Sequence, residues 1–181
     1  DHPVEYLDVD QHIMFAARLS QRAEKLLAAC RQQNIKIAIA ESCTGGLIAG
    51  CLTAIAGSSD VVERGFVTYS NDAKIEMIGV PVELINELGA VSEPVSRAMA
   101  EGALKHSNAA LSIAVTGVAG PDGGSAEKPV GLVHISCALK GSQTAHERCV
   151  FSGDRDAVRD ATIETALDMA IAAVSGHSAS A

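Results

Sequence analysis

Aromatic residues are scarce in this chain, and tryptophan is absent. Of its 181 residues only 3% are aromatic whereas 48% are hydrophobic, so the interior has to be built mainly from aliphatic side chains. Long apolar runs are also missing, and the N-terminus lacks the basic and apolar segments of a signal peptide. We therefore expect no association with a membrane.

Positive charge is in short supply as well. The chain has 14 Lys and Arg residues against 22 Asp and Glu residues, which gives a formal net charge of -8, and the basic residues form no cluster. Because the phosphate backbone of DNA or RNA attracts basic surfaces and repels acidic ones, this balance argues against nucleic-acid binding.

The five cysteines form no Cys-x-x-Cys pair, and no Cys and His residues have the spacing of a zinc site. An odd, scattered set of thiols is typical of a reducing compartment, so we expect a cytoplasmic protein. The six histidines are scattered too, and we expect neither a bound metal nor another cofactor.

The chain is long enough for one domain with a full core and short for two. We expect that domain to span residues 11–175, between a flexible leader at 1–10 and a flexible Ser-rich tail at 176–181. Apolar periodicity, capping residues and breakers predict helices at 13–33, 47–55, 72–78, 81–89, 92–106 and 154–174, and strands at 36–40, 65–69, 110–116, 130–139 and 143–151.

Helices and strands alternate along most of this pattern, which is typical of an α/β protein. The last two strands flank Lys140-Gly141-Ser142 and read as an antiparallel hairpin. We therefore predict a three-layer α/β/α sandwich around a mixed, mostly parallel sheet that contains an antiparallel hairpin.

The first candidate site is the segment 40–46, Ala-Glu-Ser-Cys-Thr-Gly-Gly, between a strand and a helix. Open α/β sheets bind ligands at the carboxyl ends of their strands. Free backbone N–H groups at the helix start favour an anion or an oxyanion, and Gly45 and Gly46 let a ligand approach closely. Ser42 and Thr44 are equally compatible with plain helix caps.

Cys43 is a rival nucleophile beside Ser42. A reactive cysteine needs a positive neighbour or a histidine base, and no histidine lies in the Gly-rich segments. The sequence therefore favours Cys43 as a small packed residue.

The second candidate is the segment 68–74, Thr-Tyr-Ser-Asn-Asp-Ala-Lys. Tyr69 is expected to end a strand, Ser70 and Asn71 to cap the next helix, and Lys74 to lie in its first turn. The positive end of the helix dipole disfavours a charged amine, and partial burial would act in the same direction, so that Lys74 could serve as a neutral base. In isolation, a lysine at this position is more often a solvated surface residue.

A third segment, 117–125, is rich in glycine and follows the strand that Thr116 ends. Successive glycine amides can form a nest for a phosphate or carboxylate, although neither a P-loop nor a Gly-x-Gly-x-x-Gly pattern is present. Arg155, at the start of the last helix, is a further candidate for the phosphate, with a surface salt bridge as its alternative.

Taken together, six segments resemble the C-terminal domain family of the competence/damage-inducible protein CinA. They are 40–46, 65–71 together with 73–74, 89–92, 116–124, 128–131 and 151–155. The resemblance runs in order from about Leu19 to Ala173, and makes residues 11–175 a CinA C-terminal-like amidase domain.

Family members that stand alone are nicotinamide-nucleotide amidases, which hydrolyse the carboxamide of nicotinamide mononucleotide to nicotinate mononucleotide and ammonia. The resemblance implies that Ser42 is the nucleophile and that Tyr69 and Lys74 complete the catalytic set. The residues expected to bind the oxyanion or the substrate are Cys43, Thr44, Gly45, Gly46, Asn71, Thr116, Gly117, Gly120, Gly123, Gly124 and Arg155.

Two other interpretations stay open at this point. One is a non-catalytic pyridine-nucleotide-binding module, and the other is an amidase with a different substrate. We also expect a homo-oligomer, with Ala-rich helices as its contact face.

Overall fold

The computed structural model describes residues 14–177. Its helices are α1 (Ala17–Gln33), α2 (Leu47–Thr53), the 3₁₀ turn η2 (Ser58–Asp60), α3 (Asn71–Ile78), α4 (Val82–Leu88), α5 (Glu93–Lys105) and α6 (Arg155–Gly176). Its strands are β1 (Ile37–Glu41), β2 (Val62–Val67), β3 (Leu111–Gly117), β4 (Leu132–Leu139) and β5 (Ala145–Val150).

The five strands form one sheet in the order β2-β1-β3-β4-β5. β1 pairs in parallel with both β2 and β3, whereas β4 is antiparallel to its neighbours β3 and β5. Only β4 therefore runs against the other strands, and the prediction of a mixed, mostly parallel sheet with an antiparallel hairpin is confirmed.

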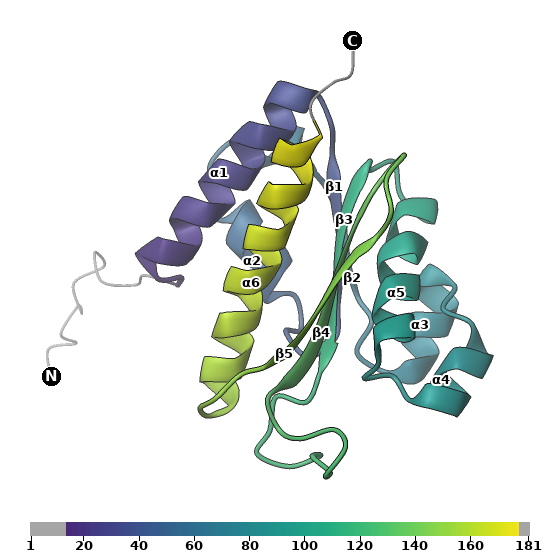
Figure 1. Ribbon diagram of the computed structural model, residues 1–181. Coiled ribbons are helices and arrows are strands. Elements are labelled where there is room, and N and C mark those ends of the chain that lie inside the picture. Colours follow the sequence, from purple (N-terminus) through teal and green to yellow (C-terminus); the bar gives the residue numbers. More distant parts are fainter. Residues whose placement is uncertain (1–13, 178–181) are drawn as a thin grey trace, which may run out of the picture.

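Helices cover both faces of this sheet (Figure 1). α1, α2 and α6 pack on one face, where the large aliphatic side chains of β1, β3 and β4 gather. α3, α4 and α5 pack on the other face, which presents the small residues Ala38, Ala40, Ala114 and Ala138. Small side chains let helices lie close to a sheet without leaving voids. The predicted three-layer sandwich is confirmed.

The predicted boundaries differ most at the ends of elements. β2 begins at Val62, three residues before the predicted start, because its charged Glu63 and Arg64 lie on an edge strand and hide the apolar pattern. The residues 14–16 precede the first helix, which begins at Ala17. α6 runs through Gly176, the first residue of the predicted tail. The predicted leader, 1–10, and the tail beyond 177 lie outside the described residues.

Two local predictions concern helix ends. Asn34 closes α1 in the left-handed conformation, with φ 53°, as its side chain favours. Ser70, and not Asn71, caps α3, since its Oγ accepts a hydrogen bond from the N–H of Ala73. None of the helices within residues 14–177 combines the length and the apolarity needed to cross a membrane.

Candidate active site

Ser42 lies directly after β1, at the carboxyl edge that β1, β2 and β3 share. Its backbone N–H donates to the carbonyl of Val115 on β3, which fixes the start of the turn that follows. Lys74 approaches from α3, the helix that begins after β2. Parallel neighbours in a sheet thus bring together side chains that are separated by 32 residues.

The Lys74 side chain is buried, with only 1% of its surface exposed. Its Nζ lies 2.9 Å from Ser42 Oγ, 2.7 Å from the carbonyl oxygen of Thr68 and 3.3 Å from that of Tyr69. The two carbonyls hold the amine in place and leave it directed at the serine hydroxyl. The surface interpretation of Lys74 is therefore wrong.

Burial lowers the pKa of Lys74 to about 8, because removal from water disfavours the ammonium form. A smaller effect of Cys43 acts in the opposite direction. The neutral amine is thus accessible near physiological pH. In that form Nζ can accept a hydrogen bond from Ser42 Oγ, which is the geometry of a nucleophile with its general base.

Tyr69 takes part in this arrangement through its backbone. Its carbonyl oxygen also lies 3.5 Å from Ser42 Oγ, whereas its side chain is 61% exposed. The phenol oxygen lies 3.4 Å from Nη2 of Arg155. The structure therefore brings the hydroxyl and the amine together directly, and directs the phenol toward the mouth of the site.

Cys43 faces the same pocket but is 7% exposed, and burial raises the pKa of its thiol to about 11. The thiol therefore stays protonated and is a poor nucleophile at neutral pH. This agrees with the packed interpretation of Cys43.

The start of α2 differs from the expected anion site, because an internal carboxylate already occupies it. Glu41 accepts hydrogen bonds from the N–H groups of Ile48 and Ala49 and from the Thr44 hydroxyl. The N–H of Gly45 donates to the Ser42 carbonyl. The N–H groups of Gly45, Ile48 and Ala49 are therefore occupied, whereas those of Thr44 and Gly46 have no acceptor in the described part of the chain. Within residues 14–177, the N–H of Cys43 has no oxygen acceptor.

A pocket of about 220 Å³ opens over the Ser42–Lys74 pair. Eight of the predicted site residues line it: Ser42, Cys43, Tyr69, Asn71, Lys74, Thr116, Gly117 and Arg155. Six others are absent from its lining: Thr44, Gly45, Gly46, Gly120, Gly123 and Gly124. The sequence thus identified the polar side chains of the pocket better than the glycines that were expected to contact the substrate through their backbone.

Ala90, Val91 and Ala119 also line the pocket and were missed. Apolar residues without chemistry of their own give no signal in a single sequence. Only their positions could have predicted them, because Ala90 and Val91 follow α4 and Ala119 follows β3, at the edge of the sheet where Ser42 lies. The Thr116 hydroxyl donates to the Ala90 carbonyl and fixes this wall.

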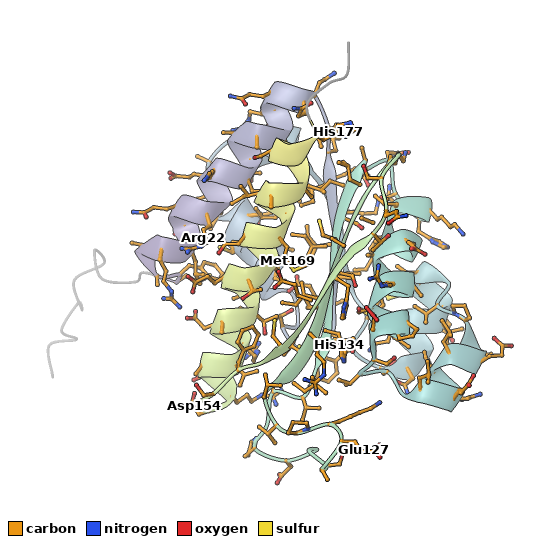
Figure 2. The ribbon with its side chains drawn as sticks, in the orientation of Figure 1. Arg22, Glu127, His134, Asp154, Met169 and His177 are labelled. Carbon is orange, nitrogen blue, oxygen red and sulfur yellow. The ribbon has the colours of Figure 1, made fainter. Side chains whose placement is uncertain are left out.

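Three glycines of the 117–125 loop, Gly117, Gly120 and Gly124, allow close packing. A Cβ on Gly117 would lie 2.8 Å from the Leu132 oxygen, and one on Gly124 would lie 2.8 Å from the Val130 nitrogen. Arg155 Nη1 donates to the carbonyl of Gly120 at 2.7 Å, which ties the loop to the start of α6. Figure 2 shows the two segments at the same end of the molecule, marked by Glu127 and Asp154.

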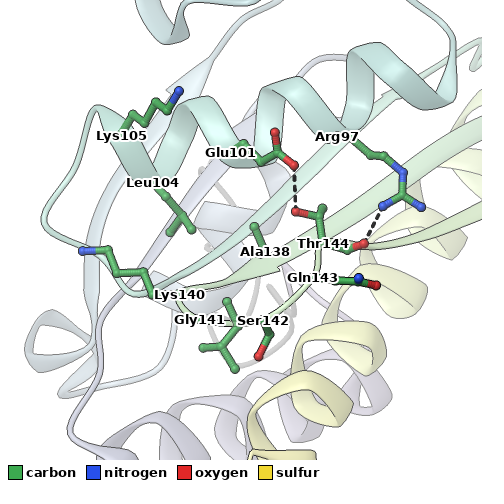
Figure 3. Close-up of a pocket in the computed structure, with 11 residues that line it drawn as sticks. Arg97, Glu101, Leu104, Lys105, Ala138, Lys140, Gly141, Ser142, Gln143 and Thr144 are labelled. Carbon is green, nitrogen blue, oxygen red and sulfur yellow. Dashed lines mark hydrogen bonds between the residues drawn. The ribbon is translucent and has the colours of Figure 1, made fainter.

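A larger pocket, of about 590 Å³, lies between α5 and the β4–β5 turn (Figure 3). Arg97 donates to the Thr144 carbonyl, and the Thr144 hydroxyl donates to Glu101. Its lining contains no hydroxyl paired with a buried amine. The Ser42 pocket is therefore the better candidate for catalysis.

Comparison with known proteins identifies the family. The family model described as CinA C-terminal domain matches residues 19–174. The chain belongs to the CinA C-terminal domain family. The resemblance of the six segments is thereby confirmed, and the family model spans all of the elements from α1 to α6 except for the ends of those two helices.

Among the curated members of the CinA family, nicotinamide-nucleotide amidohydrolase PncC from Escherichia coli K12 is 51% identical over 146 residues, which cover 81% of this chain and 88% of PncC. A CinA-like protein from Citrifermentans bemidjiense is 50% identical over 155 residues, covering 86% of this chain and 37% of that protein. The chain thus spans little more than a third of this longer relative.

The solved structure of a competence/damage inducible protein from Agrobacterium tumefaciens superimposes with a TM-score of 0.86 at 48% sequence identity. The alignment covers 89% of this chain and 98% of that one. The fold described above is thus that of the CinA family.

Proposed function

We propose that this protein is a nicotinamide-nucleotide amidase that converts nicotinamide mononucleotide to nicotinate mononucleotide and ammonia. The observation that carries the proposal is the buried Lys74 amine 2.9 Å from the Ser42 hydroxyl, on the floor of a pocket. The substrate class comes from PncC, whose length the chain matches almost completely.

In this mechanism the neutral Lys74 amine takes the proton of Ser42 as Oγ attacks the carboxamide carbon. The N–H of Cys43, adjacent to the nucleophile, donates to the developing oxyanion. One such donor contributes about 3–4 kcal/mol in other hydrolases. The Lys74 ammonium then returns the proton to the leaving nitrogen, which departs as ammonia. Water attacks the Ser42 ester, with Lys74 again as base, and releases the carboxylate product.

The rest of the substrate extends toward the mouth of the pocket. Ala90, Val91 and Ala119 flank the pyridine ring, since they are the apolar part of the lining. Arg155, whose guanidinium faces both the Tyr69 phenol and the Gly120 carbonyl, holds the phosphate. Asn71, a further polar residue of the lining, suits the ribose hydroxyls.

Ammonia release from nicotinamide mononucleotide tests the proposal. The purified protein should release ammonia in the presence of EDTA, because no step uses a metal. Ser42→Ala should abolish turnover, and Ser59→Ala, at an exposed position in the turn after α2, should keep it. A Ser42→Ala variant with the wild-type rate would exclude Ser42 as nucleophile. Recovery of unchanged nucleotide after long incubation with the wild type would favour a binding module instead.

A further inference from the structure

Glu41, the last residue of β1, is the most completely enclosed acidic side chain beside the site, with 1% of its surface exposed. Its Oε1 accepts from the Thr44 hydroxyl at 2.6 Å and from the Ile48 N–H at 2.8 Å, and its Oε2 accepts from the Ala49 N–H at 3.0 Å. Within residues 14–177 no cation forms an ion pair with it. Its hydrogen-bond partners are instead the Thr44 hydroxyl and two backbone N–H groups at the start of α2.

This contact replaces a local helix cap. The residue at the N-cap of α2 is Gly46, which has φ 107° and no side chain to accept a hydrogen bond. Glu41 provides the cap from five residues upstream. The Glu41 side chain thus ties the start of α2 to the end of β1, and the turn from Ser42 to Gly46 is held between these two points.

The backbone of Glu41 reaches the other half of the site. Its carbonyl accepts from the Thr68 N–H at 2.8 Å, and the Thr68 carbonyl in turn accepts from Lys74 Nζ at 2.7 Å. One residue therefore contacts the turn that carries the nucleophile and the segment that holds the base. A shift of Glu41 changes the position of Ser42 Oγ relative to Lys74 Nζ.

We propose that Glu41 is a positioning residue. By capping α2 its carboxylate fixes the turn 42–46, and this holds Ser42 Oγ at attack distance from its substrate and in line with Lys74. It touches neither the substrate nor the reacting atoms. This inference rests on the proposed role of Ser42 as nucleophile. Loss of the cap should lower kcat and leave KM nearly unchanged, since Ala90, Val91 and Arg155, which are proposed to hold the substrate, lie on other segments of the pocket lining.

Glu41→Gln tests this with the smallest change, because the amide keeps one acceptor and places its NH₂ against a backbone N–H. We expect kcat to fall roughly 10- to 100-fold, as small misplacements of a nucleophile do, with KM within about two-fold of the wild type. Labelling of Ser42 by phenylmethanesulfonyl fluoride, which forms the sulfonyl ester and releases fluoride and a proton, should slow by a similar factor.

Ser112→Ala is the matched control. Ser112 is buried on β3, and its hydroxyl donates to the Ala100 carbonyl at 2.7 Å, away from the turn. This variant should lose thermal stability but keep kcat. If Glu41→Gln does not fold, Thr44→Val removes one of the three hydrogen bonds to Glu41 and should lower kcat in the same direction by a smaller factor.

A folded Glu41→Gln variant with kcat and labelling rate within about two-fold of the wild type would overturn the inference. The inference would also be overturned if Ser112→Ala, with the same thermal stability as Glu41→Gln, showed the same loss of kcat. If the wild type releases no ammonia from nicotinamide mononucleotide, the proposed substrate is wrong. The labelling rates of Ser42 then still decide the role of Glu41.

Discussion

At the residue scale, the proton on Lys74 controls the proposed reaction. Burial lowers the pKa of Lys74 to about 8, and a general base acts only when it is unprotonated. We therefore expect kcat/KM to rise as the pH increases through about 8 and to level off above it. A pH–rate profile that is flat through this range would contradict Lys74 as the base.

Removal of the Lys74 amine should also lower the rate, because it removes the proposed general base. Lys74→Met should lower kcat roughly 10²- to 10⁴-fold, which is the usual contribution of a general base. Lys25→Met, at an exposed position of α1, should leave kcat unchanged and serves as the control.

The sequence predicted the residue types of the site well and their surroundings poorly. Ser42 and Lys74 could be found because each follows a strand at the same edge of the sheet. The burial of Lys74 could not, because the groups that hold it are the backbone carbonyls of Thr68 and Tyr69. The catalytic role of the Tyr69 phenol stays a prediction, and its contact with Arg155 favours a role in substrate binding.

At the scale of elements, the approach of α5 to the end of α3 depends on one glycine. A Cβ on Gly102 would lie 2.1 Å from the carbonyl oxygen of Ile78, so the two helices cannot keep their positions with any larger residue. Gly102→Ala should therefore lower the free energy of unfolding by roughly 1–3 kcal/mol, despite the better helix propensity of alanine.

Urea denaturation measures this change. Gly176→Ala is the control, because a Cβ there meets nothing within 4 Å and alanine suits the last turn of α6. It should be neutral or slightly stabilising. Equal stability of the two variants would show that α5 can move away from α3 at no cost.

A histidine pair between the β4–β5 hairpin and α5 gives a second prediction at this scale. His134 Nδ1 lies 2.9 Å from His146 Nε2, and His146 Nδ1 lies 2.9 Å from Glu93. Burial, followed by the charge of His146, lowers the pKa of His134 to about 4. The unfolded chain, with a pKa near 6.5, therefore binds a proton that the folded chain does not bind.

The free energy of unfolding should consequently fall as the pH drops from about 6.5 toward 4, and this contribution should be constant above 6.5. His134→Gln should reduce that slope in a series of thermal melts, whereas His177→Gln, at the exposed end of α6, should not. An unchanged slope in His134→Gln would assign the acid sensitivity to other groups.

Element order was predictable because the apolar periodicity of buried strands and amphipathic helices is strong. The edge strand β2 was misplaced, since its exposed residues carry no alternation that distinguishes it from a loop. The cap of α2 was also missed. It is made by Glu41 across a turn with two left-handed glycines, and local capping rules consider only the residues next to the helix.

At the scale of the whole molecule, the candidate site lies where the ends of β1, β2 and β3 meet the start of α6. The fold class could be inferred because alternating elements admit few arrangements. The oligomeric state could not be inferred from the sequence. Ala100, Ala103, Ala166 and Ala170 of the Ala-rich helices are buried in the core. The homo-oligomer and the cytoplasmic location both stay predictions.

The central claim concerns a covalent intermediate on Ser42, and rapid quenching of a single turnover in acid detects it most directly. Intact-mass analysis followed by peptide mapping should find the nucleotide acyl group on the peptide that contains Ser42. Lys74→Met, which slows its formation, should not accumulate the ester on this time scale. Full turnover of nicotinamide mononucleotide with an acyl group on another residue would contradict the account.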